Sequence, residues 1–225
     1  MILLVAATPG ILGAQTVVPI QEEPHHRLVY ETPELRVLDI EIAPGDTTLF
    51  HRHDAPIAYV FISPTPTNAQ VLGQGWGSAT QGSSPLPAIG NVIFDETYAT
   101  TPVEHRVTNL GDVAFRLIAV LNRGPGQTTS GMAPLGAAGP SETEGRWFRS
   151  THHTLANQDT WEWEGFGRPI VIVQVSSGAV AVEPEAGSTR DLEGPGDFVV
   201  LRAGARAQLR NVGGGPVTLG IVEVR

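Results

Sequence analysis

Three histidines are the residues of this chain whose types and spacing best suit chemistry. His51 and His53 are separated by one residue, and His105 stands four residues before Asn109. Side chains at positions i and i+2 of a β-strand point to the same face, so two imidazoles can act together while a neighbouring strand adds the third. Three neutral imidazoles can hold a divalent transition metal. We therefore predict a metal site at His51, His53 and His105.

The residues around these histidines resemble the two signature motifs of the cupin superfamily. Residues 45–53 read Gly, five residues, then His-Arg-His, and residues 105–109 read His, three residues, then Asn. In cupins the first motif supplies two His and usually a Glu, and the second supplies a third His. The Glu should fall where this chain has Ile57 and Ala58. The resemblance therefore implies a jelly-roll β-barrel whose metal has three histidine ligands and no carboxylate.

The composition favours β structure and excludes several kinds of site. Among 225 residues, 41% are hydrophobic and 16% charged, with 26 Gly and 18 Pro, which is typical of a turn-rich β protein. No helical stripe is evident. A net charge of −9 argues against nucleic acid as a partner, because binding phosphates requires basic patches. The chain has no Cys, so thiolate ligands and a Cys nucleophile are excluded.

An internal repeat predicts two copies of one unit. Asp46-Thr47 matches Asp159-Thr160 at an offset of 113 residues, and Asn109 matches Asn211 at an offset of 102. Together with the cupin resemblance, this predicts an all-β chain of two cupin-type jelly-roll barrels, a bicupin.

The second copy lacks the predicted metal ligands. At the offsets above, His51, His53 and His105 correspond to Glu164, Phe166 and Ala207. Phe and Ala cannot coordinate a metal, and one Glu cannot hold a transition metal alone. We therefore predict one metal per chain and a metal-free second barrel, which is either a scaffold or a site for something apolar.

Four segments follow from these observations. Residues 24–123 form the metal-binding barrel, residues 124–146 a linker rich in Gly, Pro and Ser, and residues 147–225 the degenerate barrel. Residues 1–23 begin with an apolar run that is too short to span a bilayer. The first interpretation is a secretory signal, which makes the protein periplasmic or secreted. The alternative is a strand, or an arm packed on a partner subunit of a homodimer, in an otherwise cytoplasmic protein.

The other histidines are expected to lie outside the metal site. His25-His26 are interpreted as a solvated pair, with the alternative that an N-terminal arm brings one of them to the site. His152-His153 precede the turn of the second copy, and adjacent strand residues point to opposite faces, so we do not expect them to be ligands.

Two aromatic segments have both a structural and a functional interpretation. Trp161 and Trp163 alternate, so both indoles face one side of a strand, where they pack in a core, between barrels or, alternatively, along a ligand pocket. The long stretch 63–90 contains Trp76 among glycines. It is either an extended surface hairpin or a loop that closes over a pocket.

The chemistry implied by three histidines is metal-dependent oxidation. Three-histidine cupins resemble thiol dioxygenases and diketone-cleaving dioxygenases, which use Fe(II). A metal with open positions can activate O2 or polarise a bound oxygen. Tyr59 shares the alternation of the His pair and is our candidate catalytic residue, whereas Arg52 and Arg106 should point away from the histidines.

Two functional hypotheses remain. The first is a dioxygenase-type oxidoreductase acting on a small anionic substrate, with one divalent metal; Fe(II) is favoured, and Zn, Ni or Mn are alternatives. The second is a non-catalytic metal- or small-ligand-binding protein of the cell envelope. An inward acid, base or anion-binding Arg would favour the first, and the sequence identifies none.

Overall fold

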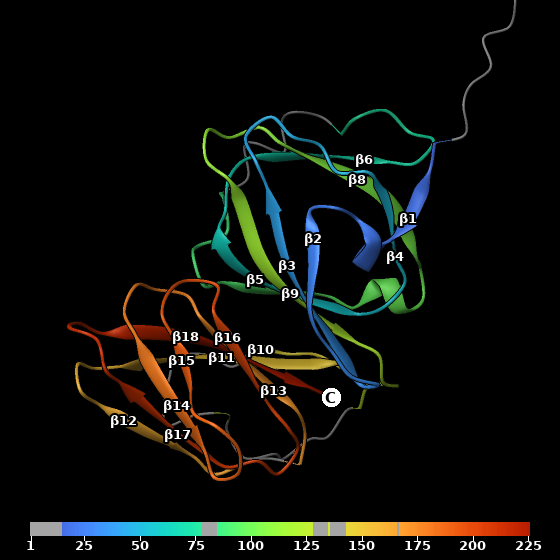
Figure 1. Ribbon diagram of the computed structural model, residues 1–225. Helices are drawn as coiled ribbons and strands as arrows, with labels where there is room; N and C mark the ends of the chain where they lie inside the picture. Colours follow the sequence, from blue (N-terminus) through green and yellow to red (C-terminus); the bar gives the residue numbers. More distant parts are fainter. Residues whose placement is uncertain (1–14, 78–84, 128–134, 136–142, 166) are drawn as a thin grey trace, which may run out of the picture.

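The computed structural model describes residues 15–77, 85–127, 135, 143–165 and 167–225. In this part of the chain the regular structure is β-strand with short 3-10 turns, arranged in four sheets. Figure 1 shows two β-barrels lying against each other, one from each half of the sequence. The predicted fold class, all-β with cupin-type jelly-roll barrels, is confirmed. The apolar run at residues 1–14 lies outside the described residues.

The first half supplies a five-stranded and a four-stranded sheet. The five-stranded sheet has the order β2-β3-β9-β5-β7 and the four-stranded sheet the order β1-β4-β8-β6. The elements are β1 (Val17–Pro19), η1 (Ile20–Glu22), β2 (His26–Glu31), β3 (Leu35–Ile42), β4 (Phe50–His53), β5 (Ile57–Ser63), β6 (Thr67–Val71), β7 (Val92–Asp95), η3 (Thr97–Ala99), β8 (Val103–Asn109) and β9 (Phe115–Asn122).

The second half repeats this arrangement. Its five-stranded sheet has the order β10-β11-β18-β13-β16 and its four-stranded sheet the order β12-β17-β14-β15. The strands are β10 (Thr143–Glu144), β11 (Phe148–Leu155), β12 (Thr160–Trp163), β13 (Ile170–Gln174), β14 (Val180–Pro184), β15 (Arg190–Leu192), β16 (Phe198–Leu201), β17 (Ala207–Asn211) and β18 (Val217–Val224).

The central strands of both five-stranded sheets are buried on both faces. In β13, Ile170 and Ile172 point into the core of the second barrel, while Val171 and Val173 pack against the first barrel. The strand therefore reads as a continuous apolar run rather than an alternating one, because neither face meets water. Side chains from both barrels form one shared core: Leu35, Val37, Ala58, Val60, Ile118 and Val120 from the first, and Phe148, Val171, Val173, Val222 and Val224 from the second.

The segments outside the predicted barrels contribute to them. Within the predicted 1–23 segment, β1 pairs in parallel with β4, so residues 17–19 are part of the first barrel's sheet. Within the predicted linker, β10 pairs with β11, and Leu135 is fully buried in the core of the second barrel. Among the described residues, no helix has the length and apolar character needed to cross a membrane.

The turn that precedes the His pair is built alike in both halves. Gly45 has φ +80°, a conformation that glycine adopts at little cost, and its N–H donates to the Asn109 carbonyl. In the second half Gln158, 113 residues later, has φ +62°. Asn109 and Asn211 each donate from Nδ2 to one carbonyl just before this turn, at Ile42 and Leu155, and to one in the loop that follows the Asn, at Val113 and Gly215. Equivalent hydrogen bonds therefore hold the turn that leads into β4 in the first half and the turn that leads into β12 in the second.

Candidate metal centre

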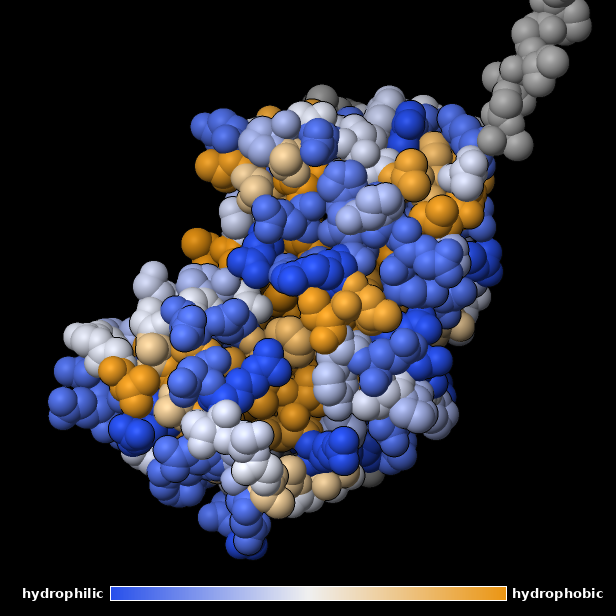
Figure 2. Space-filling model, in the orientation of Figure 1, coloured by the Kyte–Doolittle hydropathy of each residue, from blue (hydrophilic) through white to orange (hydrophobic). Residues whose placement is uncertain are grey.

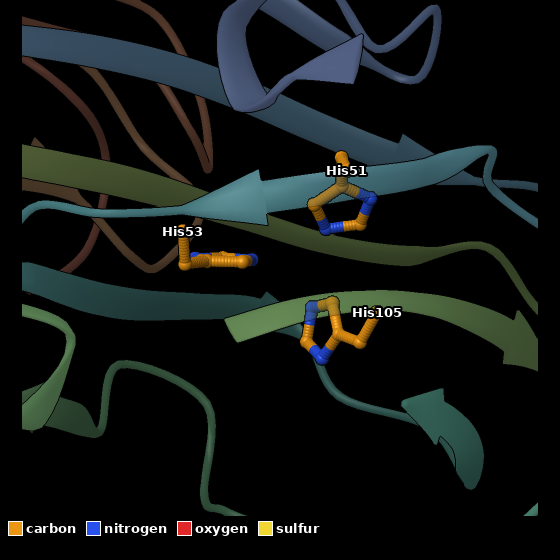
Figure 3. Close-up of side chains that lie close together, drawn as sticks. All are labelled: His51, His53 and His105. Carbon is orange, nitrogen blue, oxygen red and sulfur yellow. The ribbon is translucent and has the colours of Figure 1, made fainter. Parts of the chain in front are cut away.

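Strands β4 and β8 bring the three predicted histidines together. They pair antiparallel with His51 opposite His105, and His53 lies two residues along on the same face. One ligand atom from each ring lies within 4.8 Å of the others. The ring centroids are 4.7–5.0 Å apart, and Figure 3 shows the three imidazoles converging on one space. The sequence spacing therefore translates into one cluster.

The hydrogen bonds of these rings leave nitrogen lone pairs available to coordinate a metal. His51 Nδ1 lies 3.0 Å from the Leu49 carbonyl, so that nitrogen carries the proton and Nε2 keeps a free lone pair. Both ring nitrogens of His53 are buried and have no hydrogen-bond partner within the described structure. An unpaired buried polar atom is unfavourable, and coordination of a cation would satisfy it. The donor set therefore fits a divalent transition metal.

Burial keeps the three rings neutral. It is the main cause that lowers the pKa of His53 to about 2 and that of His105 to about 3, and the neighbouring imidazoles lower both further. Burial also lowers the pKa of His51, although the Leu49 carbonyl and Glu23 oppose it. A histidine must be neutral to bind a metal, so the cluster has the required charge state at neutral pH.

A fourth histidine lies beside the cluster, contrary to the sequence interpretation of a solvated pair. His26 is 5% exposed, and its ring centroid is 4.6 Å from that of His51 in an edge-on arrangement. Its Nδ1 lies 2.9 Å from the Ile20 carbonyl. Burial, together with the charge of His51, lowers its pKa to about 4. This agrees with the alternative interpretation, in which an N-terminal arm brings one of the pair to the site: His26 is the first residue of β2, shortly after η1.

The histidines line a cavity of about 330 Å³ in the first barrel. Its other walls are mostly apolar and include Ile40, Phe61, Pro85, Leu86, Phe115 and Leu117. Among the described residues that line it, none is Arg, Asp or Glu. A cavity of this size suits a small ligand. Besides the histidines, the polar side chains in its described lining are those of Tyr59, Thr65 and Thr67.

Tyr59 lines the same cavity, and its hydroxyl is hydrogen-bonded to that of Tyr98. Burial raises the pKa of Tyr59 well above its ordinary value, and a hydrogen bond to Tyr98 raises it further. Burial also raises the pKa of Tyr98, to about 12, with a contribution from Asp95. The Tyr98 ring lies 4.7 Å from that of His53. The two tyrosines therefore form a neutral, hydrogen-bonded wall beside the cluster.

Arg52 and Arg106 point away from the histidines, as predicted from alternation. Arg52 pairs with Glu104 and Asp54. Arg106 stacks on Trp76, with its guanidinium 4.8 Å from the ring centroid. Trp76 therefore does not close over the cavity. It pairs across a β-bridge with Gln70 on a hairpin, in agreement with the hairpin interpretation.

The second barrel places different residues at the equivalent positions from those we predicted. In the first barrel three residues lie between Thr47 and His51, whereas two lie between their partners Thr108 and His105. The extra residue bulges the strand near Leu49, which is 46% exposed.

In the second barrel two residues lie on each strand between the pairs Thr160–Arg210 and Trp163–Ala207. The counterpart of His51 is therefore Trp163 and not Glu164, because the constant offset ignored the bulge; Ala207 is the counterpart of His105, as predicted. Phe166 lies outside the described residues.

Apolar side chains fill the second barrel at this place. Trp163 is 3% exposed and packs in its core with Leu135 and Ala207. Trp161 packs against the same core and stacks on His153, and His152 bonds through Nε2 to the Gly90 carbonyl. The two tryptophans thus belong to a core, one of the interpretations from the sequence.

A larger cavity, of about 700 Å³, lies between the barrels and is lined by residues that include Tyr30, Arg168 and Arg202. Its described lining contains no histidine. On the face drawn in Figure 2, hydrophobic side chains gather where the barrels meet. We assign the chemistry to the smaller cavity, because the buried imidazoles with unpaired nitrogens lie there.

Comparisons with known proteins identify similar folds but do not assign the chain to a family. No family model matches the chain, and no curated protein matches it. Among solved structures, the chain is similar to AerE from Microcystis aeruginosa, with a TM-score of 0.61 and 11% identity over 90% of this chain and 98% of that one.

It is also similar to the salicylate 1,2-dioxygenase from Pseudaminobacter salicylatoxidans, with a TM-score of 0.57 and 14% identity over 87% of this chain and 72% of that one. A mutant of that enzyme in complex with gentisate gives a TM-score of 0.56 and 13% identity, over 87% of this chain and 70% of that one. At such identities the likeness concerns the fold alone.

Proposed function

We propose that this chain is a metal-binding bicupin whose first barrel holds one divalent transition metal through His51, His53 and His105. The observation that carries the proposal is the state of His53, both of whose ring nitrogens are buried and unpaired between two other imidazoles. The second barrel is a metal-free support, since Trp163 and Ala207 occupy the counterparts of His51 and His105.

The activity that we propose is that of a non-haem Fe(II) dioxygenase-type oxidoreductase. When bound, Fe(II) with three histidine ligands supplies open positions for O2 and an organic ligand. The protein contributes a cavity of about 330 Å³ with mostly apolar walls, and an apolar ligand that filled it would displace water from the reacting groups. The fold that this chain shares with a salicylate 1,2-dioxygenase is compatible with such a reaction but does not specify it.

The substrate that we propose is a small, singly anionic molecule whose remaining surface is apolar. Three neutral imidazoles leave the charge of a dication unbalanced, so an enolate, carboxylate or thiolate would complete it. No Arg lines the described cavity, so a second anionic group would be buried without a partner, which is costly. Tyr59 and Tyr98 would hold the substrate through their ring faces and a neutral hydroxyl pair.

The second candidate is a non-catalytic metal- or small-ligand-binding protein of the cell envelope. One observation favours it: Tyr59 is the one non-histidine side chain that we considered catalytic, and its hydroxyl is hydrogen-bonded to Tyr98 with a raised pKa. Such a group is a poor base near neutral pH.

Oxygen consumption separates the two candidates. The full chain is loaded anaerobically with Fe(II), mixed with diketones, thiols or hydroxy acids, and followed with an oxygen electrode. We expect uptake with an apolar monoanion such as a β-diketone enolate, and none with the double variant His51→Ala, His53→Ala. No uptake with any substrate, together with tight Zn binding, would favour the binding protein instead.

A further inference from the structure

Glu23 is a buried carboxylate close to the histidine cluster. It follows η1 directly, and its side chain is 0% exposed. Its ion-pair partners among the described residues are His25 and His26, and no arginine in that part of the chain contacts it. Burying a carboxylate is costly unless hydrogen bonds stabilise it, so its position requires an explanation.

The carboxylate is held in its ionised form by donors on two segments. It accepts the backbone N–H of His25 at 2.6 Å and that of Leu49 at 3.0 Å. The His25 ring lies 3.0 Å away through Nδ1. Burial raises the pKa of Glu23, but the bonds from His25 and Leu49 and the proximity of His26 outweigh it and keep the pKa below its ordinary value. A full negative charge therefore lies inside this end of the barrel.

Two contacts connect this charge to His51. Leu49 donates its N–H to Glu23 and accepts the Nδ1–H of His51 with its carbonyl, at 3.0 Å in each case. Leu49 lies where the first barrel has its extra residue, so Glu23 also fixes the bulge. The second contact is His26, whose Nε2 lies 3.7 Å from the Glu23 carboxylate while its ring packs edge-on against that of His51.

We propose that Glu23 is a positioning residue of the metal centre: it orients His51 through Leu49 and His26, and it supplies from outside the ligand set the negative charge that the three histidines lack. This inference rests on the proposed metal site. Carboxylates that act through a ligating histidine raise its basicity and fix its ring, and their loss typically weakens metal binding about 10–100-fold. Burial strengthens the attraction, since less water screens it.

The test compares Glu23→Gln with the wild-type full chain. Co(II) and Zn(II) affinities are measured by competition with a chromophoric chelator, and the Fe(III)/Fe(II) potential by redox titration. We expect affinity to fall about 10-fold and the potential to become more positive, because the lost negative charge stabilised Fe(III) more than Fe(II).

The matched control is Asp39→Asn, which neutralises a buried carboxylate of the same barrel that pairs with Arg27 and Arg116. We expect it to lower the melting temperature and leave affinity and potential unchanged. If Glu23→Gln does the same, Glu23 is merely structural and the inference is wrong.

If Glu23→Gln does not fold, Glu23→Asp is measured instead, and an affinity equal to that of the wild type overturns the inference. Failure of the wild type to bind any transition metal overturns the proposed function and this inference together, whereas wild-type binding with an indifferent Glu23 overturns only the inference.

Discussion

At the scale of single residues, each histidine has a different environment that suits the same purpose. His51 has one nitrogen fixed by the Leu49 carbonyl, whereas His53 has neither nitrogen paired within the described structure. His105 faces His51 across the sheet. An apolar barrel would normally exclude three such polar rings, since buried imidazoles without partners are unfavourable. Their presence together is the strongest residue-level argument for a bound cation.

Removing two of these rings should abolish metal binding. The double variant His51→Ala, His53→Ala leaves one histidine, which cannot hold a transition metal. We expect one metal per wild-type chain and none per variant chain by elemental analysis after dialysis. His153→Ala serves as the control, because its ring stacks on Trp161 in the second barrel; a stoichiometry near two, or retention of metal in the double variant, would contradict the assignment.

Asp39 makes stability depend on pH in the acid range. Burial raises its pKa, but hydrogen bonds from Arg116 and Arg27 outweigh this and leave the pKa below its ordinary value. A depressed carboxyl pKa adds stability above the unfolded-state value of about 3.9, and this stability is lost as the pH falls through the folded-state value.

We therefore expect Asp39→Asn to lower the free energy of unfolding by about 2 kcal/mol at pH 7. The deficit relative to the wild type should shrink below about pH 4. Urea denaturation at pH 7, 5 and 3 measures it, and a deficit that stays constant over this range would refute the role given to the ion pair.

At the scale of elements, one additional residue distinguishes the two copies. The stretch before β4 contains an extra residue relative to β8, whereas β12 and β17 run in register. Such a bulge changes which side chains face inward downstream of it, because faces alternate at every residue. In the first barrel inward positions carry His51 and His53, and in the second the inward position carries Trp163, packed with Leu135.

Trp163→Ala should therefore destabilise the second barrel without affecting metal content. Truncating a buried aromatic side chain costs about 3–5 kcal/mol, which for a chain of this size lowers the melting temperature by about 10 °C. Calorimetry and elemental analysis of the same sample measure both quantities. Loss of metal at an unchanged melting temperature would mean that the second barrel carries the site.

At the scale of the whole molecule, the barrels share a core instead of being tethered by a linker alone. Val60, Val120, Val173 and Val222 belong to one cluster that crosses the junction. Polar contacts surround it: Asn122 Nδ2 donates to the Trp147 and Arg225 carbonyls, and Arg116 donates to that of Pro195. The two halves should consequently unfold together.

Val173→Thr tests this coupling with almost no change in volume. Val173 is fully buried at the junction, and burying an unpaired hydroxyl there costs about 1–3 kcal/mol. We expect a single calorimetric transition shifted down by several degrees. Val113→Thr is the matched control, because Val113 is 53% exposed and should be neutral; two separate transitions in the wild type would show that the barrels are independent.

The sequence alone predicted the fold class and the histidine cluster, from two kinds of signal. Alternation along a strand places His51 and His53 on one face, and the internal repeat predicts two units. The resemblance of residues 45–53 and 105–109 to the two cupin motifs then predicted that His105 joins the pair in a jelly-roll barrel.

Other features were decided by tertiary structure. The burial of His26 and Glu23 depends on how η1 and β2 pack against the rest of the barrel. The hydrogen bond between Tyr59 and Tyr98 depends on the contact between β5 and η3. The alignment of His51 with Trp163 depends on a bulge that only strand pairing reveals. Contacts between segments distant in sequence leave no periodic signal, so the surroundings of the site could not be predicted as its ligands were.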